Sequence, residues 1–271
     1  MAKELPRRGY DVVLLDDHIR SFMQRDIQIN SLIGNVDWVL HFAGSTSIEL
    51  SLKNPFYTYS NNVESTLAAL ETTFSSGCPF LFMSSYVYGQ PRYSPIDEKH
   101  PVKPSNPYMG SKIIGEEICR HFGEMLKIPL VILRGFNIYG DYVIPGRLIS
   151  DLIESVRNNT PLVLNDPLPR RDYLYIKDFL SLVLKILMKD PAESGTYNVG
   201  FGCSYSNVEV AEMVRKLAGG KLPIIIKSNP RTCDISDCNV DITLVKKTFS
   251  WIPEYTLENG LSDIISGNPL R

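Results

Sequence analysis

Short apolar runs alternate along the chain with segments whose apolar residues recur every three or four positions. The runs at 36–44, 80–83 and 129–134 are rich in Val, Leu, Ile and Phe, which predicts buried strands. A helix is predicted from residue 108 onward, and a second over 178–188 with a wide apolar face. The first of these helices carries four apolar residues at helical spacing: Ile114, Ile118, Phe122 and Met125.

Other stretches predict shorter elements. A brief buried strand is expected at Val12–Leu15, and the alternation at 171–177 predicts another strand. Asn62 is expected to begin a helix that carries Leu67, Leu70 and Phe74 on one face. His41 lies inside an apolar run, so we expect a hydrogen-bonded core histidine there rather than a catalytic one.

Composition narrows the class of protein. The 271 residues are 44% hydrophobic and 21% charged with a net charge of −2, which is typical of a globular protein with one or two domains. This charge gives no support for a nucleic-acid partner. The five cysteines show neither zinc spacing nor a disulfide framework, so we expect free thiols, no metal site and a cytoplasmic protein. No apolar run approaches the ~20 residues that a membrane span requires.

Tyr108 and Lys112 are four residues apart at the start of a predicted helix, so their side chains share one face. A lysine ammonium beside a phenol favours the phenolate, and a serine from a strand end, Ser84, can hold a substrate hydroxyl. A Tyr-x-x-x-Lys pair alone is more often an ordinary surface pair. A second one, Tyr173 with Lys177, is interpreted as structural. The upstream Ser-Ser-Tyr-Val-Tyr-Gly favours the catalytic interpretation of the first.

At these residues the chain resembles the extended short-chain dehydrogenase/reductase family, which contains the nucleotide-sugar epimerases and dehydratases. The resemblance runs from Leu5 to about residue 265. It implies an α/β fold, with a Rossmann-like doubly wound parallel sheet and a smaller C-terminal substrate domain. The NAD-binding domain is expected at 1–144 and 171–195, and the substrate domain at 145–170 and 196–271.

The resemblance implies NAD as cofactor. An acid at the end of the second strand accepts hydrogen bonds from ribose hydroxyls, and its charge disfavours a 2′-phosphate. Two acids after a strand are, by themselves, equally typical of a turn. The cofactor-binding residues that the resemblance implies are Asp16, Asp17, Asp26, Ile27, Phe42, Ala43, Gly44, Tyr108, Lys112 and Phe136.

One part of the family pattern is absent. A glycine-rich turn is expected ~20 residues before the acid at Asp16, and the residues that precede Asp16 form no such turn. The family's first strand is absent with it. Gly200-Phe201-Gly202 is no replacement, because it lacks the third glycine. Either the sequence begins late relative to the working protein, or this fold is completed in another way.

The residues after Ser84 distinguish reaction types. In the family the serine or threonine four before the second tyrosine is catalytic, which makes Ser84 catalytic together with Tyr108 and Lys112. Dehydratases carry an Asp-Glu pair at the next two positions, where this chain has Ser85 and Tyr86. Elimination is therefore disfavoured, and epimerisation or keto reduction remains.

The resemblance also implies a site for a nucleotide diphosphate. A guanidinium meets phosphate oxygens in a bidentate manner, which suits Arg171 and Arg231. Without the resemblance, Asn137 would be read as a turn residue, and Arg231 with Asp234 as a surface ion pair. The substrate-binding residues implied are Ser85, Tyr86, Asn137, Arg171, Arg231 and Asp234.

The sequence thus predicts an NAD-dependent nucleotide-sugar epimerase that acts at C4 of a UDP-sugar through a 4-keto intermediate. A nucleotide-sugar 4-ketoreductase and a remnant without cofactor binding are the alternatives. In the family the helices corresponding to 62–75 and 108–126 pair across a homodimer. Their apolar residues are equally compatible with an intramolecular core.

Overall fold

A computed structural model describes residues 4–14, 36–142, 144–189, 192–229 and 235–267. The chain divides into two compact units. The first comprises Met1–Ser84, Asn106–Ile132 and Asp190–Gly195, and the second comprises the remainder. These units are defined by packing. The predicted division into NAD-binding and substrate domains is one of function and stays a prediction.

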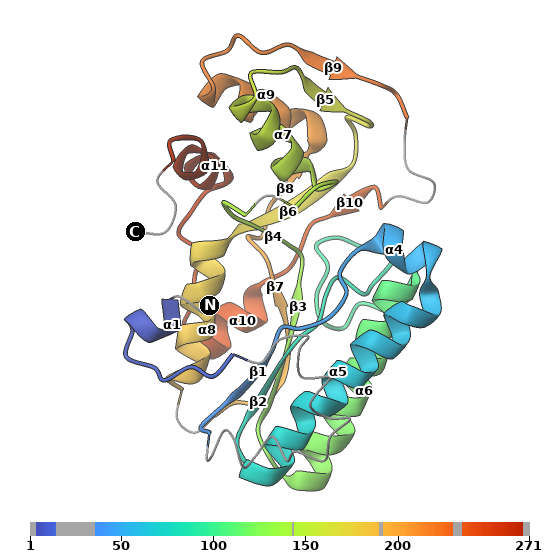
Figure 1. Cartoon of the computed structure of the whole chain (residues 1–271), viewed down its shortest axis with the longest axis vertical. Helices are drawn as coiled ribbons and strands as arrows, with labels where there is room; N and C mark the ends of the chain where they lie inside the picture. Colours follow the sequence, from blue (N-terminus) through green and yellow to red (C-terminus); the bar gives the residue numbers. More distant parts are fainter. Residues whose placement is uncertain (1–3, 15–35, 143, 190–191, 230–234, 268–271) are drawn as a thin grey trace. The chain divides into compact units, whose positions relative to one another are not determined.

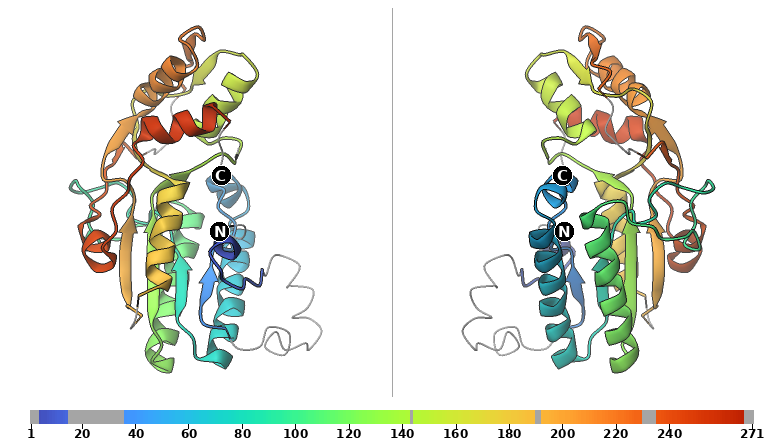
Figure 2. Two further views of the ribbon diagram at one scale, coloured as in Figure 1. Left: turned by 90° about the vertical axis from the view of Figure 1, so that its left-hand side faces the viewer. Right: turned by 90° about the vertical axis from the view of Figure 1, so that its right-hand side faces the viewer.

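The first unit contains two parallel strands, β1 (Val39–His41) and β2 (Phe80–Met83), paired with Val39 opposite Phe80. β2 is followed in the sheet by β3 (Leu130–Gly135), whose first residues also belong to this unit. Its helices are α1 (Glu4–Arg7), α4 (Ile48–Lys53), α5 (Pro55–Ser76) and α6 (Pro107–Leu126). α5 and α6 run side by side along the sheet (Figures 1 and 2).

A small apolar core joins this sheet to the two long helices. It consists of Leu70, Phe80, Phe82, Cys119 and Ile132, all at most 1% exposed. Burying each large side chain contributes about 1.5–3 kcal/mol. The residues of β2 that take part are Phe80 and Phe82, so one face of the strand is committed to the helices.

Asn54 lies at the junction of α4 and α5. Its backbone N–H donates to the carbonyl of Leu50 at the end of α4 (2.8 Å), and its side-chain oxygen accepts from the backbone N–H of Tyr57 at the start of α5 (3.3 Å). Pro55 occupies the first position of α5, where the missing N–H is not needed. The helix predicted from Asn62 therefore begins seven residues earlier, because the cap and the proline set its start.

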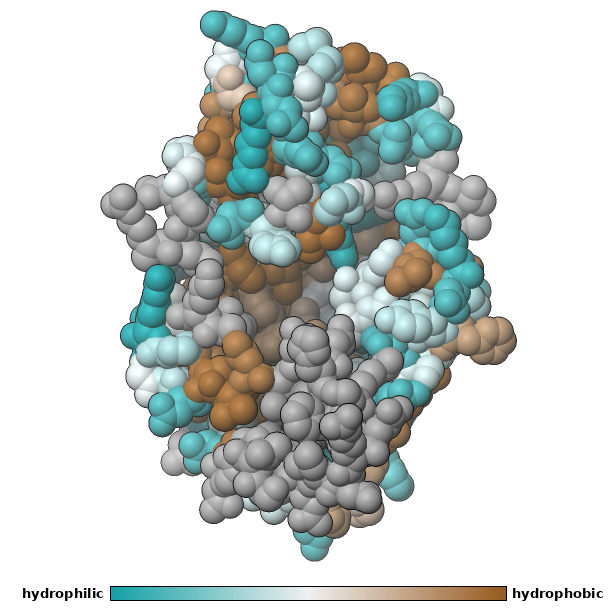
Figure 3. All heavy atoms as spheres, in the orientation of Figure 1, coloured by the Kyte–Doolittle hydropathy of each residue, from teal (hydrophilic) through white to brown (hydrophobic). Residues whose placement is uncertain are grey.

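Apolar side chains reach the surface on α4 and at the start of α5. Ile48, Leu50, Leu52 and Phe56 are all more than a third exposed, and Figure 3 shows apolar side chains where α4 lies. Val13 and Leu14 are exposed as well, at 58% and 67%. The buried strand predicted at Val12–Leu15 is therefore wrong for residues 12–14, which pair with no described strand.

The second unit is organised around β6 (Arg170–Tyr175). It pairs in parallel with β4 (Asn137–Tyr139) and β10 (Asp237–Cys238), and antiparallel with β8 (Ser204–Ser206). The strand predicted at 171–177 ends at Tyr175, and Lys177 lies in the next helix. The remaining elements are β5 (Leu162–Leu164), β7 (Gly195–Val199), β9 (Ile224–Ile226), α7 (Leu148–Arg157), α8 (Ile176–Leu187), α9 (Asn207–Leu217), α10 (Thr243–Phe249) and α11 (Leu257–Ile265).

Two buried carboxylates hold the loops of this unit. Asp172 in β6 is 0% exposed and accepts from the backbone N–H groups of residues 201, 202 and 203, at 2.6, 2.7 and 2.9 Å. Asp178 in α8 accepts from the N–H groups of Glu254 and Tyr255. Each carboxylate thus ties backbone N–H groups of a separate loop to its own element, residues 201–203 to β6 and residues 254–255 to α8.

Candidate active site

The first turn of α6 presents Tyr108. Asn106 caps the helix by accepting from the N–H of Met109 (2.9 Å), and Pro107 follows as the first helical residue. This start places Tyr108 in the first turn and Lys112 one turn later on the same face. The helix predicted from residue 108 is thus confirmed, and its cap explains why it begins there.

Lys112 is only 4% exposed, and its side chain extends to the end of β2. Its Nζ donates to the backbone carbonyl of Met83 (2.9 Å) and lies over the ring of Phe82, 5.1 Å from the centroid. Burial lowers the pKa of Lys112 to about 8. The ammonium is therefore the main form at neutral pH, and a carbonyl and an aromatic face stabilise it.

Ser84 follows β2 and is 2% exposed. Its Oγ donates to Oε1 of Glu116 (2.6 Å), and Oε2 of Glu116 pairs with the guanidinium of Arg120 (2.6 Å). Glu116 stands two helical turns beyond Tyr108 on α6. The structure therefore connects Ser84 to α6 through a carboxylate that the sequence analysis did not single out.

The loop after β1 contains Phe42, Ala43 and Gly44. Gly44 has a φ of +137°, and a Cβ there would lie 2.9 Å from Oδ1 of Asn62 and 3.6 Å from Nζ of Lys112. Glycine is required at this position by its backbone conformation and by the closeness of both side chains. The loop is thus brought next to Lys112, as the sequence analysis expected of residues that serve one site.

Asn62 is a further residue that the sequence analysis missed. It is 4% exposed, its Oδ1 accepts from the N–H of Ser45 (2.7 Å), and its Nδ2 donates to Oγ of Ser111 (2.8 Å). Ser111 in turn donates to the carbonyl of Tyr108 (2.7 Å). Two consecutive asparagines, Asn61 and Asn62, at the predicted start of a helix were the signal that the sequence offered. Only the fold shows what Asn62 binds.

The predicted core histidine is confirmed. His41 is 5% exposed in β1, and its Nε2 lies 3.2 Å from Oγ1 of Thr66. Burial first, and then the charge of Lys112, lower the pKa of His41 to about 3. The ring is therefore neutral at physiological pH.

Comparisons with known proteins agree with this geometry. Residues 1–200 match the model of the NAD dependent epimerase/dehydratase family. The chain belongs to that family. It is 28% identical to the UDP-glucose 4-epimerase of Lactobacillus helveticus, over 98% of this chain and 90% of that protein.

Solved structures of family members are similar as well. The UDP-glucose 4-epimerase of Bifidobacterium longum, in complex with NAD+ and UDP, superposes with a TM-score of 0.84 at 27% identity, covering 97% of this chain and 85% of that one. The UDP-glucose 4-epimerase of Thermotoga maritima gives 0.87 at 22% identity, covering 98% and 93%, and supports the fold alone. The predicted family and the α/β, Rossmann-like fold are confirmed.

The described residues of this family member suit the cofactor that the family's description names. The buried ammonium of Lys112 lies beside the loop that contains Gly44, which places a positive charge at the end of β1 for a cofactor that carries phosphate groups. Of the other residues predicted to bind cofactor, Phe136 is half-buried in the second unit. Asp16, Asp17, Asp26 and Ile27 lie outside the described residues.

Two of the predicted substrate residues lie at the start of the second unit. Ser85 is half-buried, and Tyr86 is 8% exposed with its hydroxyl donating to the carbonyl of Gly89. The Tyr86 ring meets that of Phe136 edge-on at 5.2 Å. Burial raises the pKa of Tyr86 far above its ordinary value, so its hydroxyl stays protonated.

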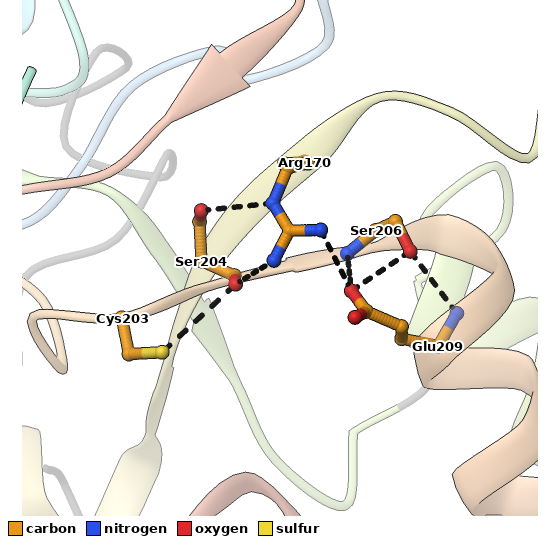
Figure 4. Close-up of polar contacts among 5 residues, drawn as sticks. All are labelled: Arg170, Cys203, Ser204, Ser206 and Glu209. Atoms are coloured by element: carbon orange, nitrogen blue, oxygen red, sulfur yellow. Dashed lines mark hydrogen bonds and ion pairs between the residues drawn. The ribbon is translucent and has the colours of Figure 1, made fainter.

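Two further residues predicted to bind substrate lie in strands of the second unit, Asn137 in β4 and Arg171 in β6. Asn137 donates to the carbonyl of Asp172 (3.0 Å), and Arg171 donates to the carbonyl of Ile235 (2.6 Å). The neighbouring Arg170 is held by Ser204 and Glu209, as Figure 4 shows. Arg231 and Asp234 lie outside the described residues, so the predicted pairing of Arg171 with Arg231 stays a prediction.

Two features are absent from the described part of the chain. Among these residues no group of His, Cys, Asp and Glu is arranged to hold a metal ion. No helix within the described ranges is long and apolar enough to cross a membrane.

Proposed function

We propose that this chain is an NAD-dependent nucleotide-sugar epimerase that acts at C4 of a UDP-sugar through a 4-keto intermediate. The observation that carries the proposal is that α6 places Tyr108 one turn before a buried Lys112, whose Nζ is fixed at the end of β2. Relatives named as UDP-glucose 4-epimerases match nearly the whole chain, which supports the substrate class.

Tyr108 is proposed as the base that removes the proton from the C4 hydroxyl. A phenol has an ordinary pKa of about 10, and a nearby ammonium lowers it toward the working pH. Lys112 supplies that charge and, on the same proposal, holds the nicotinamide ribose. NAD, when bound, accepts the C4 hydride and returns it to the other face. Ser84 orients the C4 hydroxyl, whose proton Tyr108 then removes.

Dehydration is disfavoured at this site. Ser85 and Tyr86 have no carboxylate to act as acid or base. The Tyr86 hydroxyl is bound to Gly89 and has a raised pKa, so it cannot serve as the base instead. Oxidation and return of hydride need no such group, which favours epimerisation.

The second unit is proposed to bind the nucleotide diphosphate. Arg171 supplies a planar cation that matches phosphate oxygens, with Asn137 two strand positions away on the paired strand β4. On the same proposal Arg231 and Asp234 contact phosphate and ribose.

We also propose that α5 and α6 pair with a second copy of the chain. Four large apolar side chains on these helices are exposed: Leu67 (43%), Phe74 (60%), Ile114 (41%) and Met125 (54%). These four therefore lie outside the intramolecular core that the spacing also allowed, whereas Leu70 belongs to that core and Ile118 and Phe122 pack against it. Burying each against a partner contributes about 1.5–3 kcal/mol.

The test is conversion of UDP-glucose to UDP-galactose with NAD+, followed by chromatography. Tyr108→Phe should lower the rate about 1000-fold or more, since acid–base groups contribute up to about 10⁴-fold. Tyr142→Phe, at an 84% exposed tyrosine, is the matched control and should retain the native rate. Full activity in Tyr108→Phe would overturn the proposal. Stoichiometric NADH oxidation with a 4-keto sugar would identify a ketoreductase instead.

A further inference from the structure

Glu116 is a buried carboxylate on the helix that carries Tyr108 and Lys112. Its side chain is 1% exposed. Burial of a charge is strongly unfavourable unless the charge is paired and hydrogen-bonded. Both oxygens of Glu116 are engaged, one by the guanidinium of Arg120 and one by the hydroxyl of Ser84, each at 2.6 Å. Arg120 thus supplies the opposite charge that a buried carboxylate requires.

The contact with Glu116 fixes the direction of the Ser84 hydroxyl. An ionised carboxylate has no proton to donate, so Ser84 must be the donor. A serine hydroxyl has one proton, and in Ser84 it is directed at Glu116. The Ser84 oxygen then offers only lone pairs to other groups. It accepts from a ligand hydroxyl and cannot donate to it.

Glu116 also stands one helical turn beyond Lys112, on the same face of α6. Burial lowers the pKa of Lys112 to about 8, while the Cys119 thiol and the Glu116 carboxylate oppose that shift. Burial raises the pKa of Cys119 to about 12, so this thiol is neutral at pH 7. Of the two, Glu116 is the group that carries negative charge there.

The other elements around Lys112 supply mostly uncharged groups. β1 supplies His41, which is neutral because its pKa is about 3. β2 supplies the Met83 carbonyl, the Phe82 ring and Ser84, whereas α5 supplies the Asn62 amide next to Gly44. α6 also supplies Tyr108, one turn before Lys112.

We infer that Glu116 is a positioning residue for the reaction: it turns the Ser84 hydroxyl into an acceptor and keeps Lys112 protonated from one helical turn away. The inference rests on the proposed function for its catalytic meaning. A purely structural ion pair would instead affect folding alone, with no effect on the titration of Lys112.

The test is a ¹³C NMR titration of the protein labelled at the lysine ε-carbon, with the Lys112 signal assigned by its loss in Lys112→Met. Glu116→Gln keeps the size of the side chain and removes its charge. The midpoint for Lys112 should fall by about one pH unit, the size of effect expected of a nearby charge in a partly buried setting. Arg120→Gln leaves the buried carboxylate of Glu116 without its cation, which favours the neutral acid, so the Lys112 midpoint should fall in this variant too.

Glu117→Gln is the matched control. Glu117 also pairs with Arg120, but its side chain is 69% exposed. The Lys112 midpoint should therefore stay within about 0.2 pH units of the native value. If Glu116→Gln does not fold, the downward shift in Arg120→Gln still tests the inference. An unchanged midpoint in Glu116→Gln, or in Arg120→Gln where only that variant folds, would overturn it.

Epimerase assays then separate this inference from the proposed function. In Glu116→Gln the alkaline limb of the kcat profile should move to lower pH together with the Lys112 midpoint, and Glu116→Asp should restore part of the shift. Full activity in Tyr108→Phe alongside a shifted Lys112 midpoint would overturn the proposed function and leave the action of Glu116 on Lys112 standing. Loss of activity in Tyr108→Phe, with an unshifted Lys112 midpoint in Glu116→Gln, would support the proposed function and overturn the action of Glu116 on Lys112.

Discussion

The side-chain amide of Asn62 donates to Oγ of Ser111 across α5 and α6, at 2.8 Å. The same side chain binds both backbone polar groups of Ser45, and Ser111 reaches the carbonyl of Tyr108. One amide thus joins the loop after β1, α5 and the first turn of α6. The position of Tyr108 relative to that loop depends on it.

Asn62→Ala should therefore lower both stability and activity. The substitution leaves the N–H of Ser45 without its acceptor, which costs about 1–3 kcal/mol of unfolding free energy. Urea unfolding measures that loss, and kcat should fall with it. Ser60→Ala, at an exposed position on the same helix, should change the unfolding free energy by less than about 0.5 kcal/mol. Equal stability of the two variants would contradict the role of Asn62.

Two glycines of α6 should respond to alanine in opposite directions. A Cβ at Gly115 would lie 2.6 Å from Cζ of Phe82, whereas a Cβ at Gly123 would lie 3.4 Å from the side chain of Leu130. Alanine in place of glycine gains about 1 kcal/mol within a helix. Gly115→Ala should still destabilise, because the Phe82 ring in the core must move, while Gly123→Ala should be neutral or stabilising. Thermal unfolding of both variants checks the pair, and a stabilised Gly115→Ala would show that α6 packs less tightly on β2.

Acid should destabilise the fold through His41. Its pKa is about 3 in the folded chain, against an ordinary value of 6.5. Between these values the unfolded chain binds more protons, so stability is complete above pH 6.5 and falls as the pH is lowered. From pH 7 to pH 5 this group should cost about 2 kcal/mol.

The matched variants for His41 are His41→Gln and His121→Gln. The first removes the titrating ring, so the loss of stability between pH 7 and pH 5 should become smaller. The second removes an exposed histidine on α6 and should leave the native pH dependence in place. Urea midpoints at the two pH values provide the measurement. Identical slopes in all three proteins would argue that His41 is not the group responsible.

Light scattering tests the proposed pairing of α5 and α6 with a second copy. The chain has a mass of 30.6 kDa, so the native protein should give twice that value. Phe74→Glu places a charge within the exposed apolar side chains of these helices and should yield the single-chain mass. Met188→Glu, also at an exposed apolar residue, should remain paired. A native protein at 30.6 kDa would contradict the pairing.

Much of α6, the helix that carries the proposed base, could be predicted from the sequence. Tyr108 and Lys112 have a spacing that brings them to one face, and Pro107 favours a helix start at that point. The strand at 80–83 was equally clear, because an apolar run of four is too short for a helix and is followed by small residues. In both places local preference and tertiary packing agree.

The residues that tie the site together could not be predicted in the same way. Glu116 looks like any acid on a helix surface until α6 is packed on β2 and Ser84 meets it. Asn62 has low helix propensity, so the sequence suggested a helix start there. Tertiary contacts with Ser45 and Ser111 hold it inside α5 instead. Such roles depend on partners 17 to 49 positions away.

The stretch at Val12–Leu15 illustrates a different limit. Its composition favours a strand, but a strand forms only where a neighbour offers backbone partners. Residues 12–14 meet none among the described residues, and Val13 and Leu14 stay exposed. β-propensity describes the fit to a pleated, half-buried surface, and no such surface covers these residues in the described structure.

Asn54 closes α4 with its backbone and opens α5 with its side chain. Asn54 alone separates the two helices, so the rotation of α5 about its axis is fixed relative to α4. Inserting a single residue after Asn54 would rotate α5 by about 100° relative to its cap. Loops elsewhere in the chain can absorb insertions and deletions. This junction cannot accept them, so we expect homologues to show no insertion or deletion at this point.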